Sequence, residues 1–271
     1  MQQDKQLENA IDKMACGRGS DFSSLFEEFM DLALCPLCNN PNERQIELWN
    51  KAQKDEQYNK AFIEALQAYG DAAMDYHDPL GEMFMMRISH GNHGQFFTPE
   101  PICDFMEKII EPIGESVCDP TCGSGRLLLS GLNTSRQKGF EPWIYGNDLS
   151  YTCAKMSLLN LLINRARGEV TCGNSLLLDY NNYIFFKIDR VLVASGIWFS
   201  TYWQYTLANL DEVEAKRNAW KAELLKNGLW VELPRKTADE PQKAAVIEEE
   251  REEEKELPVV CNATQLQLEL F

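Results

Sequence analysis

The sequence VCDPTCGSG at residues 117–125 predicts the end of a β-strand, a tight glycine turn and the start of a helix. Pro120 cannot donate a ladder hydrogen bond, so we expect the strand to end at Asp119. Gly123 and Gly125 permit positive φ angles and a close approach of backbone to a ligand. This order is typical of the first unit of a nucleotide-binding α/β sheet, although a glycine turn on its own is more often a plain loop.

The chain after this loop alternates between apolar strand patterns and helical patterns. Four further strands are predicted, at residues 143–146, 170–172, 189–194 and 229–233, with helices over 151–164 and 208–226 between them. Such alternation favours a parallel, doubly wound α/β sheet of about five strands. Ligand loops should then lie at the carboxyl ends of the strands, near Asp119, Asp148, Asn174 and Ser195.

The first 92 residues predict a helical region. Apolar residues between 22 and 33 recur at spacings of three and four, with Ser20 or Asp21 as the cap. A second helix is expected over 44–69, with Gly70 as a possible interruption, followed by short helices from 78 and from 102. Phe96 and Phe97 lie in a loop after the glycine-rich segment 90–94, where they either stack on a ligand ring or close the core.

Composition limits the classes of partner. The chain has 271 residues and a net charge of −16, so it is not expected to coat DNA by itself, because nonspecific affinity comes from Lys and Arg neutralising phosphates. DNA binding would need a local basic patch or a partner. No apolar run approaches the roughly 20 residues of a membrane span, and the polar N-terminus lacks a signal-peptide core. We therefore expect a cytoplasmic protein with no membrane partner.

The nine cysteines are expected to be reduced thiols. Cys35 and Cys38 have the spacing of metal ligands, but no second CxxC or HxxxH pair accompanies them. The favoured interpretation is two buried thiols at a helix end with no metal, and a zinc site built on Cys35 and Cys38 is the alternative.

The order of motifs resembles the adenine-N6 DNA methyltransferases, in particular the modification subunits of type I restriction systems and their stand-alone relatives. The motifs are DPLGEMFM, GQFFTPEPICDFM, VCDPTCGSG, GND, CAKMSLLNLLIN and CGNSL, within residues 78–198. The resemblance implies a Rossmann-like methyltransferase sheet, S-adenosylmethionine as cofactor, and methyl transfer to adenine in DNA.

The resemblance also implies roles for individual residues. Phe97 and Thr98 would line the cofactor's side, and Asp119, Gly123 and Gly125 would surround its methionine part. Asp148 would hold the ribose hydroxyls, and Asn174 would reach the adenine ring. An acidic, glycine-lined cleft with an aromatic lid suits a sulfonium ligand.

The catalytic motif departs from the family. The family has Asn or Asp, Pro, Pro and Tyr or Phe, and the matching positions here are Ser195, Gly196, Ile197 and Trp198. Ser195 would offer a hydroxyl in place of an amide oxygen, Gly196 a backbone carbonyl, and Trp198 a ring to stack on the base. Loss of such a positioned acceptor costs on the order of 3 kcal/mol. The expected function is a DNA adenine-N6 methyltransferase. The alternative is a silent module that binds a methyltransferase subunit, a specificity subunit or a sliding clamp.

The C-terminal part has a different composition. Residues 236–262 are charged and low in complexity, which predicts an acidic flexible linker between a methyltransferase-like domain over 93–235 and a terminal peptide over 263–271. Gln267, Leu268, Leu270 and Phe271 resemble the peptide by which bacterial replication and repair proteins dock on the sliding clamp. The two apolar end residues would act as anchors in a pocket.

Overall fold

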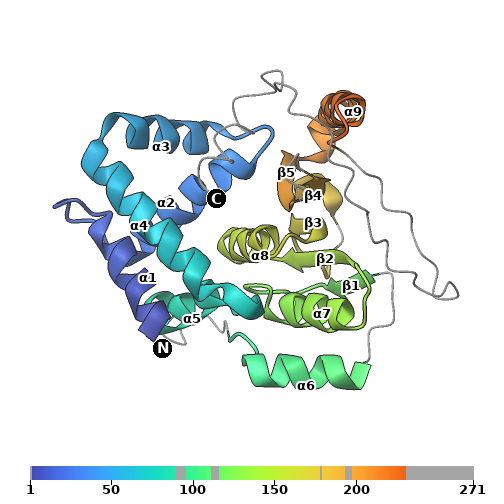
Figure 1. Cartoon of the computed structure of the whole chain (residues 1–271), viewed down its shortest axis with the longest axis horizontal. Coiled ribbons are helices and arrows are strands. Elements are labelled where there is room, and N and C mark those ends of the chain that lie inside the picture. The colour runs from blue at the N-terminus through green and yellow to red at the C-terminus, as the bar shows by residue number, and fades with distance from the viewer. Residues whose placement is uncertain (1, 90–95, 111–115, 178, 193–196, 230–271) are drawn as a thin grey trace, which may run out of the picture.

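The computed structural model of the chain describes residues 2–89, 96–110, 116–177, 179–192 and 197–229. Figure 1 shows an α/β sheet with a group of helices on one side of it. The helices are α1 (Gln2–Lys13), α2 (Phe22–Leu34), α3 (Glu43–Lys54), α4 (Glu56–Ala72), α5 (Pro79–Met83), α6 (Glu100–Ile110), α7 (Arg126–Gln137), α8 (Tyr151–Ile163) and α9 (Leu210–Lys226). The strands are β1 (Ser116–Asp119), β2 (Trp143–Asp148), β3 (Arg167–Cys172), β4 (Ile184–Leu192) and β5 (Trp198–Tyr205).

The five strands lie in the order β1-β2-β3-β4-β5. The first three are parallel, and the expectation of a parallel strand after them is wrong, because β4 runs antiparallel to β3 and β5 antiparallel to β4. Only residues 173–183 connect β3 to β4, and a parallel return needs a crossover of about a dozen residues or more. The sheet is therefore mixed and sequential instead of parallel and doubly wound.

The last strands also differ from expectation. Residues 198–205 form β5, which the sequence pattern did not single out. The predicted strand over 229–233 lies outside the described residues except for Leu229, whose carbonyl accepts a hydrogen bond from the Leu192 N–H at 3.1 Å.

Helices cover the sheet unequally. Helices α7 and α8 lie on the face toward the N-terminal helices, and α8 packs on β2, β3 and β5 on one side and on α2 on the other (Figure 1). Because it is enclosed from both sides, α8 is apolar on most of its surface and buries residues 153–162. Helix α9 packs on β5, where the Trp203 and Trp220 rings meet edge to face at 5.8 Å.

The N-terminal helices follow the predicted pattern with one exception. Asp21 caps α2 by accepting a hydrogen bond from the Ser24 N–H at 2.9 Å, as predicted. The single helix expected over 44–69 is wrong, because the chain breaks at Asp55. The Asp55 carboxylate accepts from the Tyr58 N–H at 3.0 Å and so starts α4 as a new helix. Gly70 continues α4 without interruption.

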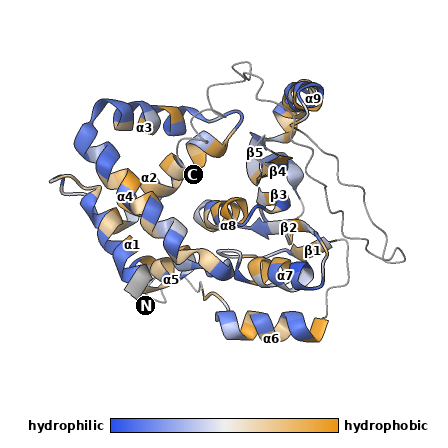
Figure 2. Ribbon diagram, viewed as in Figure 1, coloured by the Kyte–Doolittle hydropathy of each residue, from blue (hydrophilic) through white to orange (hydrophobic). Residues whose placement is uncertain are grey.

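Helix α6 differs from the other helices in its exposed apolar face. It packs on α7, yet five large apolar side chains are 38% to 66% exposed: Ile102, Phe105, Met106, Ile109 and Ile110. Figure 2 shows this apolar character on α6, outside the main helical layer. None of the described helices is both long enough and apolar enough to cross a lipid bilayer.

Candidate functional site

Three backbone N–H groups of the glycine loop after β1 donate hydrogen bonds that hold the loop in place. The Cys122 N–H donates to the Asn147 carbonyl at 2.8 Å, the Gly123 N–H to Asp148 Oδ2 at 2.9 Å, and the Gly125 N–H to the Cys122 carbonyl at 2.8 Å. Gly123 and Gly125 have φ angles of 56° and 91°, in the left-handed region that favours glycine. The loop is therefore fixed by the ends of β1 and β2 before any ligand arrives.

Both glycines are also required by close packing. A Cβ on Gly123 would lie 2.8 Å from the Phe97 ring, and a Cβ on Gly125 would lie 2.7 Å from Ser157 Oγ. Phe97 in turn stacks on Phe84 with ring centroids 5.6 Å apart. Phe96 points away and is 72% exposed. Of the two alternatives for these aromatic residues, Phe97 packs against the loop and the core, and Phe96 is exposed.

Two carboxylates lie at the carboxyl ends of β1 and β2. Asp119 Oδ1 accepts from the Thr121 N–H at 2.9 Å, and Asp148 Oδ1 accepts from the Ser150 N–H at 2.8 Å. Burial raises the pKa of Asp119, and the negative charge of Asp148 raises it further. A cation bound beside this pair would relieve the repulsion between the carboxylates, so the electrostatics favour a positively charged ligand.

The sequence prediction missed Asn147 as a residue that joins the loops. Its side-chain amide donates to the Pro120 carbonyl at 3.1 Å and to the Gly173 carbonyl at 3.0 Å, and its oxygen accepts from Thr171 Oγ1 at 2.7 Å. Asn147 thus connects the loops that follow β1 and β3. Its only sequence signal is its place beside Asp148 at a strand end.

Thr98 and Asn174 border the same edge of the sheet. The Thr98 carbonyl accepts from Arg126 at 3.5 Å, next to the glycine loop. Asn174 Oδ1 accepts from the Leu176 and Leu177 N–H groups at 3.0 and 3.3 Å, which shapes the turn after β3. The structure therefore gathers the residues proposed for the cofactor around the ends of three parallel strands: Phe97, Thr98, Asp119, Gly123, Gly125, Asp148 and Asn174.

The expected catalytic residues do not join this group. Ser195 and Gly196 lie outside the described residues. Trp198 pairs with Leu192 at the far end of antiparallel β4, so it lies at the opposite edge of the sheet from Asp119 and Asp148. The Arg190 guanidinium covers its ring at 4.8 Å. The expectation that Trp198 borders the cofactor loops is wrong here, because it assumed a parallel fourth strand.

Cys35 and Cys38 are buried thiols at the end of α2. Burial raises the pKa of Cys35 to about 11 and that of Cys38 to about 12, which opposes the thiolate form that binds metals. Within the described ranges, no group of three or more metal-ligating side chains is clustered.

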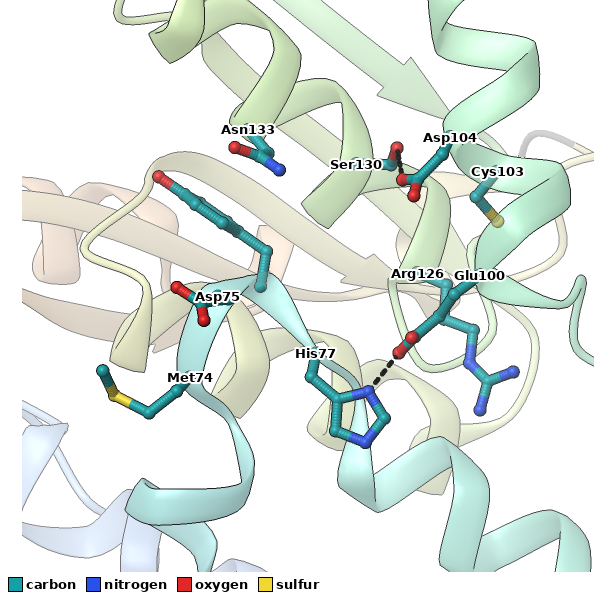
Figure 3. A pocket seen from close by; sticks show the side chains of 10 residues that line it. Met74, Asp75, His77, Glu100, Cys103, Asp104, Arg126, Ser130 and Asn133 are labelled. Atoms are coloured by element: carbon teal, nitrogen blue, oxygen red, sulfur yellow. Dashed lines mark hydrogen bonds and ion pairs between the residues drawn. The ribbon is translucent and has the colours of Figure 1, made fainter. Parts of the chain in front are cut away.

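A small polar cavity of about 130 Å³ lies behind the loop, between residues 74–77, α6 and α7 (Figure 3). His77 Nδ1 contacts Glu100 Oε1 at 2.6 Å, and its Nε2 contacts Asp4 Oδ1 at 3.1 Å. These carboxylates, Glu100 foremost, raise the pKa of His77 to about 9 although burial opposes them. The protonated imidazole links α1 to Glu100, the first residue of α6. The cavity therefore lies beside the ion pairs that hold α6 in place.

Comparison with known protein families shows the family of this chain. The family model for N-6 DNA Methylase matches residues 76–251, well over half of the sequence. This chain belongs to the N-6 DNA methylase family. The matched range includes the glycine loop, the Asp119 and Asp148 carboxylates and the turn at Asn174.

Curated relatives of this family member are type I methylase subunits. The MjaIX methylase subunit of Methanocaldococcus jannaschii is 31% identical over 85 residues, covering 30% of this chain and 15% of that protein. The EcoEI subunit of Escherichia coli is 31% identical over 86 residues, covering 28% and 18%. The HindI subunit of Haemophilus influenzae is 25% identical over 134 residues, covering 47% and 30%. The matches thus span less than a third of the length of each relative.

Among solved structures, a crystal structure from Listeria monocytogenes assigned to the class I S-adenosylmethionine-dependent methyltransferases is similar. It has a TM-score of 0.46 and 16% sequence identity, and the match covers 64% of this chain and 53% of that one.

Proposed function

We propose that this chain binds S-adenosylmethionine at the carboxyl ends of β1, β2 and β3 and acts in methylation of adenine N6 in DNA. The observation that carries the proposal is the hydrogen bond from the Gly123 N–H to Asp148 Oδ2 at 2.9 Å, which joins a left-handed glycine loop to the acid of the second strand. A glycine loop and an acid at these two places are the parts with which such sheets hold a nucleoside.

The residues present fit this cofactor. The space that a Cβ would fill at Gly123 lies beside the Phe97 ring, so backbone without a side chain and an aromatic ring lie together at the loop. Asp119 keeps an oxygen for the amino group of a methionine part, and Asp148 keeps acceptor capacity for ribose hydroxyls. Asn174 borders the position proposed for the adenine ring.

The chemistry follows from the family. The cofactor supplies an electrophilic methyl group when it is bound. The protein's own part is to fix the loop, to place the Phe97 ring beside it and to bind the cofactor through Asp119 and Asp148. Trp198 is not assigned to the target base, because it lies at the opposite edge of the sheet.

Calorimetric titration of the full chain with S-adenosylmethionine and S-adenosylhomocysteine tests the cofactor proposal. We expect one site per chain for each compound. Absence of heat and of thermal stabilisation with both compounds would contradict it. Methyl transfer to mixed-sequence DNA then separates the two functions. Transfer supports the enzyme, and binding without transfer supports a silent module.

We also propose that DNA recognition depends on a partner subunit. The net charge of −16 opposes DNA binding by the chain alone, and the exposed apolar face of α6 supports contact with another protein. A salt titration of DNA binding tests this. The chain alone should bind no more tightly than the ~10⁻⁴–10⁻⁶ M of nonspecific complexes at physiological salt. Tighter, sequence-selective binding by the chain alone would contradict it.

Docking of residues 267–271 on a sliding clamp remains a proposal from the sequence, because these residues lie outside the described ranges. Replacing Leu270 and Phe271 by alanine should abolish capture by immobilised bacterial clamp. Unchanged capture would end this proposal.

A further inference from the structure

Asp78 is a fully buried carboxylate that lies outside the cofactor edge, the name used here for the carboxyl ends of β1, β2 and β3 with their loops. It caps α5, and its oxygens accept four hydrogen bonds. Oδ1 accepts from the Gly81 N–H at 2.8 Å and from Asn160 Nδ2 at 2.7 Å. Oδ2 accepts from Ser124 Oγ and from Arg126 Nε, the latter at 2.7 Å. Every acceptor position of this carboxylate is therefore used.

The donors to Asp78 include both residues that flank Gly125. Ser124 lies between the two glycines of the loop, and Arg126 is the first residue of α7. Asn160 on α8 adds a second contact by donating to the Ser124 carbonyl at 3.0 Å. Asp78 and Asn160 thus hold the loop by hydrogen bonds on the side that faces the N-terminal helices.

The network extends in two further directions. The Arg126 guanidinium donates to Glu82 at 2.6 Å and to the Thr98 carbonyl at 3.5 Å, so it also holds the segment that carries Phe97. The Tyr69 hydroxyl at the end of α4 donates to Asn160 Oδ1 at 2.8 Å. The buried Asp78 carboxylate and its partners therefore connect the N-terminal helices, the segment that carries Phe97 and the glycine loop.

Gly81 leaves the space that this arrangement needs. A Cβ at residue 81 would lie 2.8 Å from Asp78 Cγ and 2.5 Å from Ser124 Oγ. Neither group can retreat, because both are buried. Within the Asp-Pro-Leu-Gly sequence at 78–81, Asp78 thus caps α5 and also binds Ser124 of the glycine loop, and Gly81 leaves room for both contacts.

We propose that Asp78 is a positioning residue for the cofactor loop, acting through Ser124 and Arg126 without touching the ligand. The inference rests on the proposed function, because it takes residues 119–125 as the cofactor loop. An aspartate is needed because asparagine offers only one acceptor oxygen and no charge for Arg126. Its consequence is that the N-terminal helical region controls cofactor affinity from behind the loop.

The test compares wild-type full chain with Asp78→Asn and Ser124→Ala. Amide hydrogen exchange without cofactor is measured first. Both variants should speed exchange at residues 121–126 by roughly tenfold relative to β2 and β3 amides, because a buried partner is lost. Calorimetry with S-adenosylhomocysteine should then show affinity weakened by roughly tenfold for Ser124→Ala and more for Asp78→Asn.

Ser130→Ala is the matched control. Ser130 is a buried serine of α7, one turn after Arg126, and its hydroxyl donates to Asp104 of α6 at 2.6 Å and not to Asp78 or the loop. It should lose comparable thermal stability but keep loop exchange and affinity. Ser124→Ala keeps the test decisive if Asp78→Asn fails to fold.

The outcomes are distinguishable. Wild-type loop exchange and affinity in a folded Ser124→Ala variant would overturn the inference and leave the proposed function intact. Equal effects in Ser130→Ala would overturn it too, since the change would then be general destabilisation. If the wild type binds no cofactor, the proposed function fails, and loop exchange alone still decides whether Asp78 holds the loop.

Discussion

Asp148 Oδ2 accepts a hydrogen bond from the backbone N–H of Gly123 at 2.9 Å, across 25 residues of sequence. The other oxygen of the same carboxylate accepts from the Ser150 N–H, one residue before α8 begins. One side chain therefore fixes the first loop and the start of the next helix, so loop position and ribose binding depend on the same group.

Asp148→Ala should weaken cofactor binding by roughly 10- to 100-fold, because the Gly123 N–H loses its acceptor and the ligand loses a carboxylate. Calorimetry checks this. Asp179→Ala is the control, because Asp179 also accepts from a backbone N–H, that of Asn181 at 3.4 Å, but in an exposed turn. Equal affinities for both variants would show that Asp148 has no special role.

Asp119→Asn should stabilise the protein while abolishing cofactor binding. The pKa of Asp119 is raised above its ordinary value of 3.8 by burial and then by Asp148, so the folded state holds the proton more tightly than the unfolded state. The stability that the neutral form contributes is lost as pH rises through the raised pKa, and at neutral pH the charged group destabilises the fold. Asparagine still accepts from the Thr121 N–H.

We expect the Tm of Asp119→Asn to rise by roughly 1 to 3 °C at neutral pH, a small effect because the carboxylate is partly exposed. In the wild type, cofactor affinity should fall as pH falls toward the raised pKa, because protonation removes the charge that faces the cation. Scanning calorimetry and titration at several pH values measure the two effects. A lower Tm with retained binding would contradict both.

His77→Gln should remove a pH dependence of stability. The pKa of His77 is raised from 6.5 to about 9 by Glu100 first and then by Asp4. The stabilisation is therefore complete below about pH 6.5 and is lost as pH rises through about 9. Solvent screening limits it to on the order of 1 kcal/mol. Thermal unfolding should show a steeper fall in wild-type Tm across this range than in the variant, and parallel curves would contradict it.

Much of the cofactor edge could be predicted from the sequence, because its signals are local. Pro120 ends a strand, Gly123 and Gly125 require a left-handed backbone, and Asp148 follows an apolar run. Pro120, Gly123 and Gly125 constrain the backbone at their own positions, and Asp148 is found from its place at the end of an apolar run, so no knowledge of distant contacts is needed to predict them.

The direction of β4 could not be predicted in this way. The apolar run at 189–194 indicates a strand but carries no information about which neighbour it pairs with. The deciding feature is the length of the connection, since the only helix among its described residues is the single 3-10 turn Tyr180–Asn182. The roles of Asp78 and Asn160 could not be predicted from the sequence either. Asp78 is 46 positions from Ser124 and 82 positions from Asn160, so no local pattern links them.

Trp198 gives the sharpest contrast between the family pattern and this structure. If a parallel fourth strand carried it to the cofactor edge, replacement of the indole would alter binding or transfer. In the structure it pairs with Leu192 and lies under Arg190 at the other edge, so its contribution is to packing. Trp198→Leu should lower the Tm by a few °C, since the ring that the Arg190 guanidinium covers is lost.

The same variant should bind S-adenosylhomocysteine with wild-type affinity. Calorimetry and any methyl transfer to DNA are measured on it beside Phe97→Leu, which removes the ring that packs on Gly123. Loss of transfer in folded Trp198→Leu, with affinity intact, would mean that Trp198 reaches the target base and that β4 runs parallel to β1 in the working protein. Loss confined to Phe97→Leu would follow from the antiparallel β4 and β5 described here.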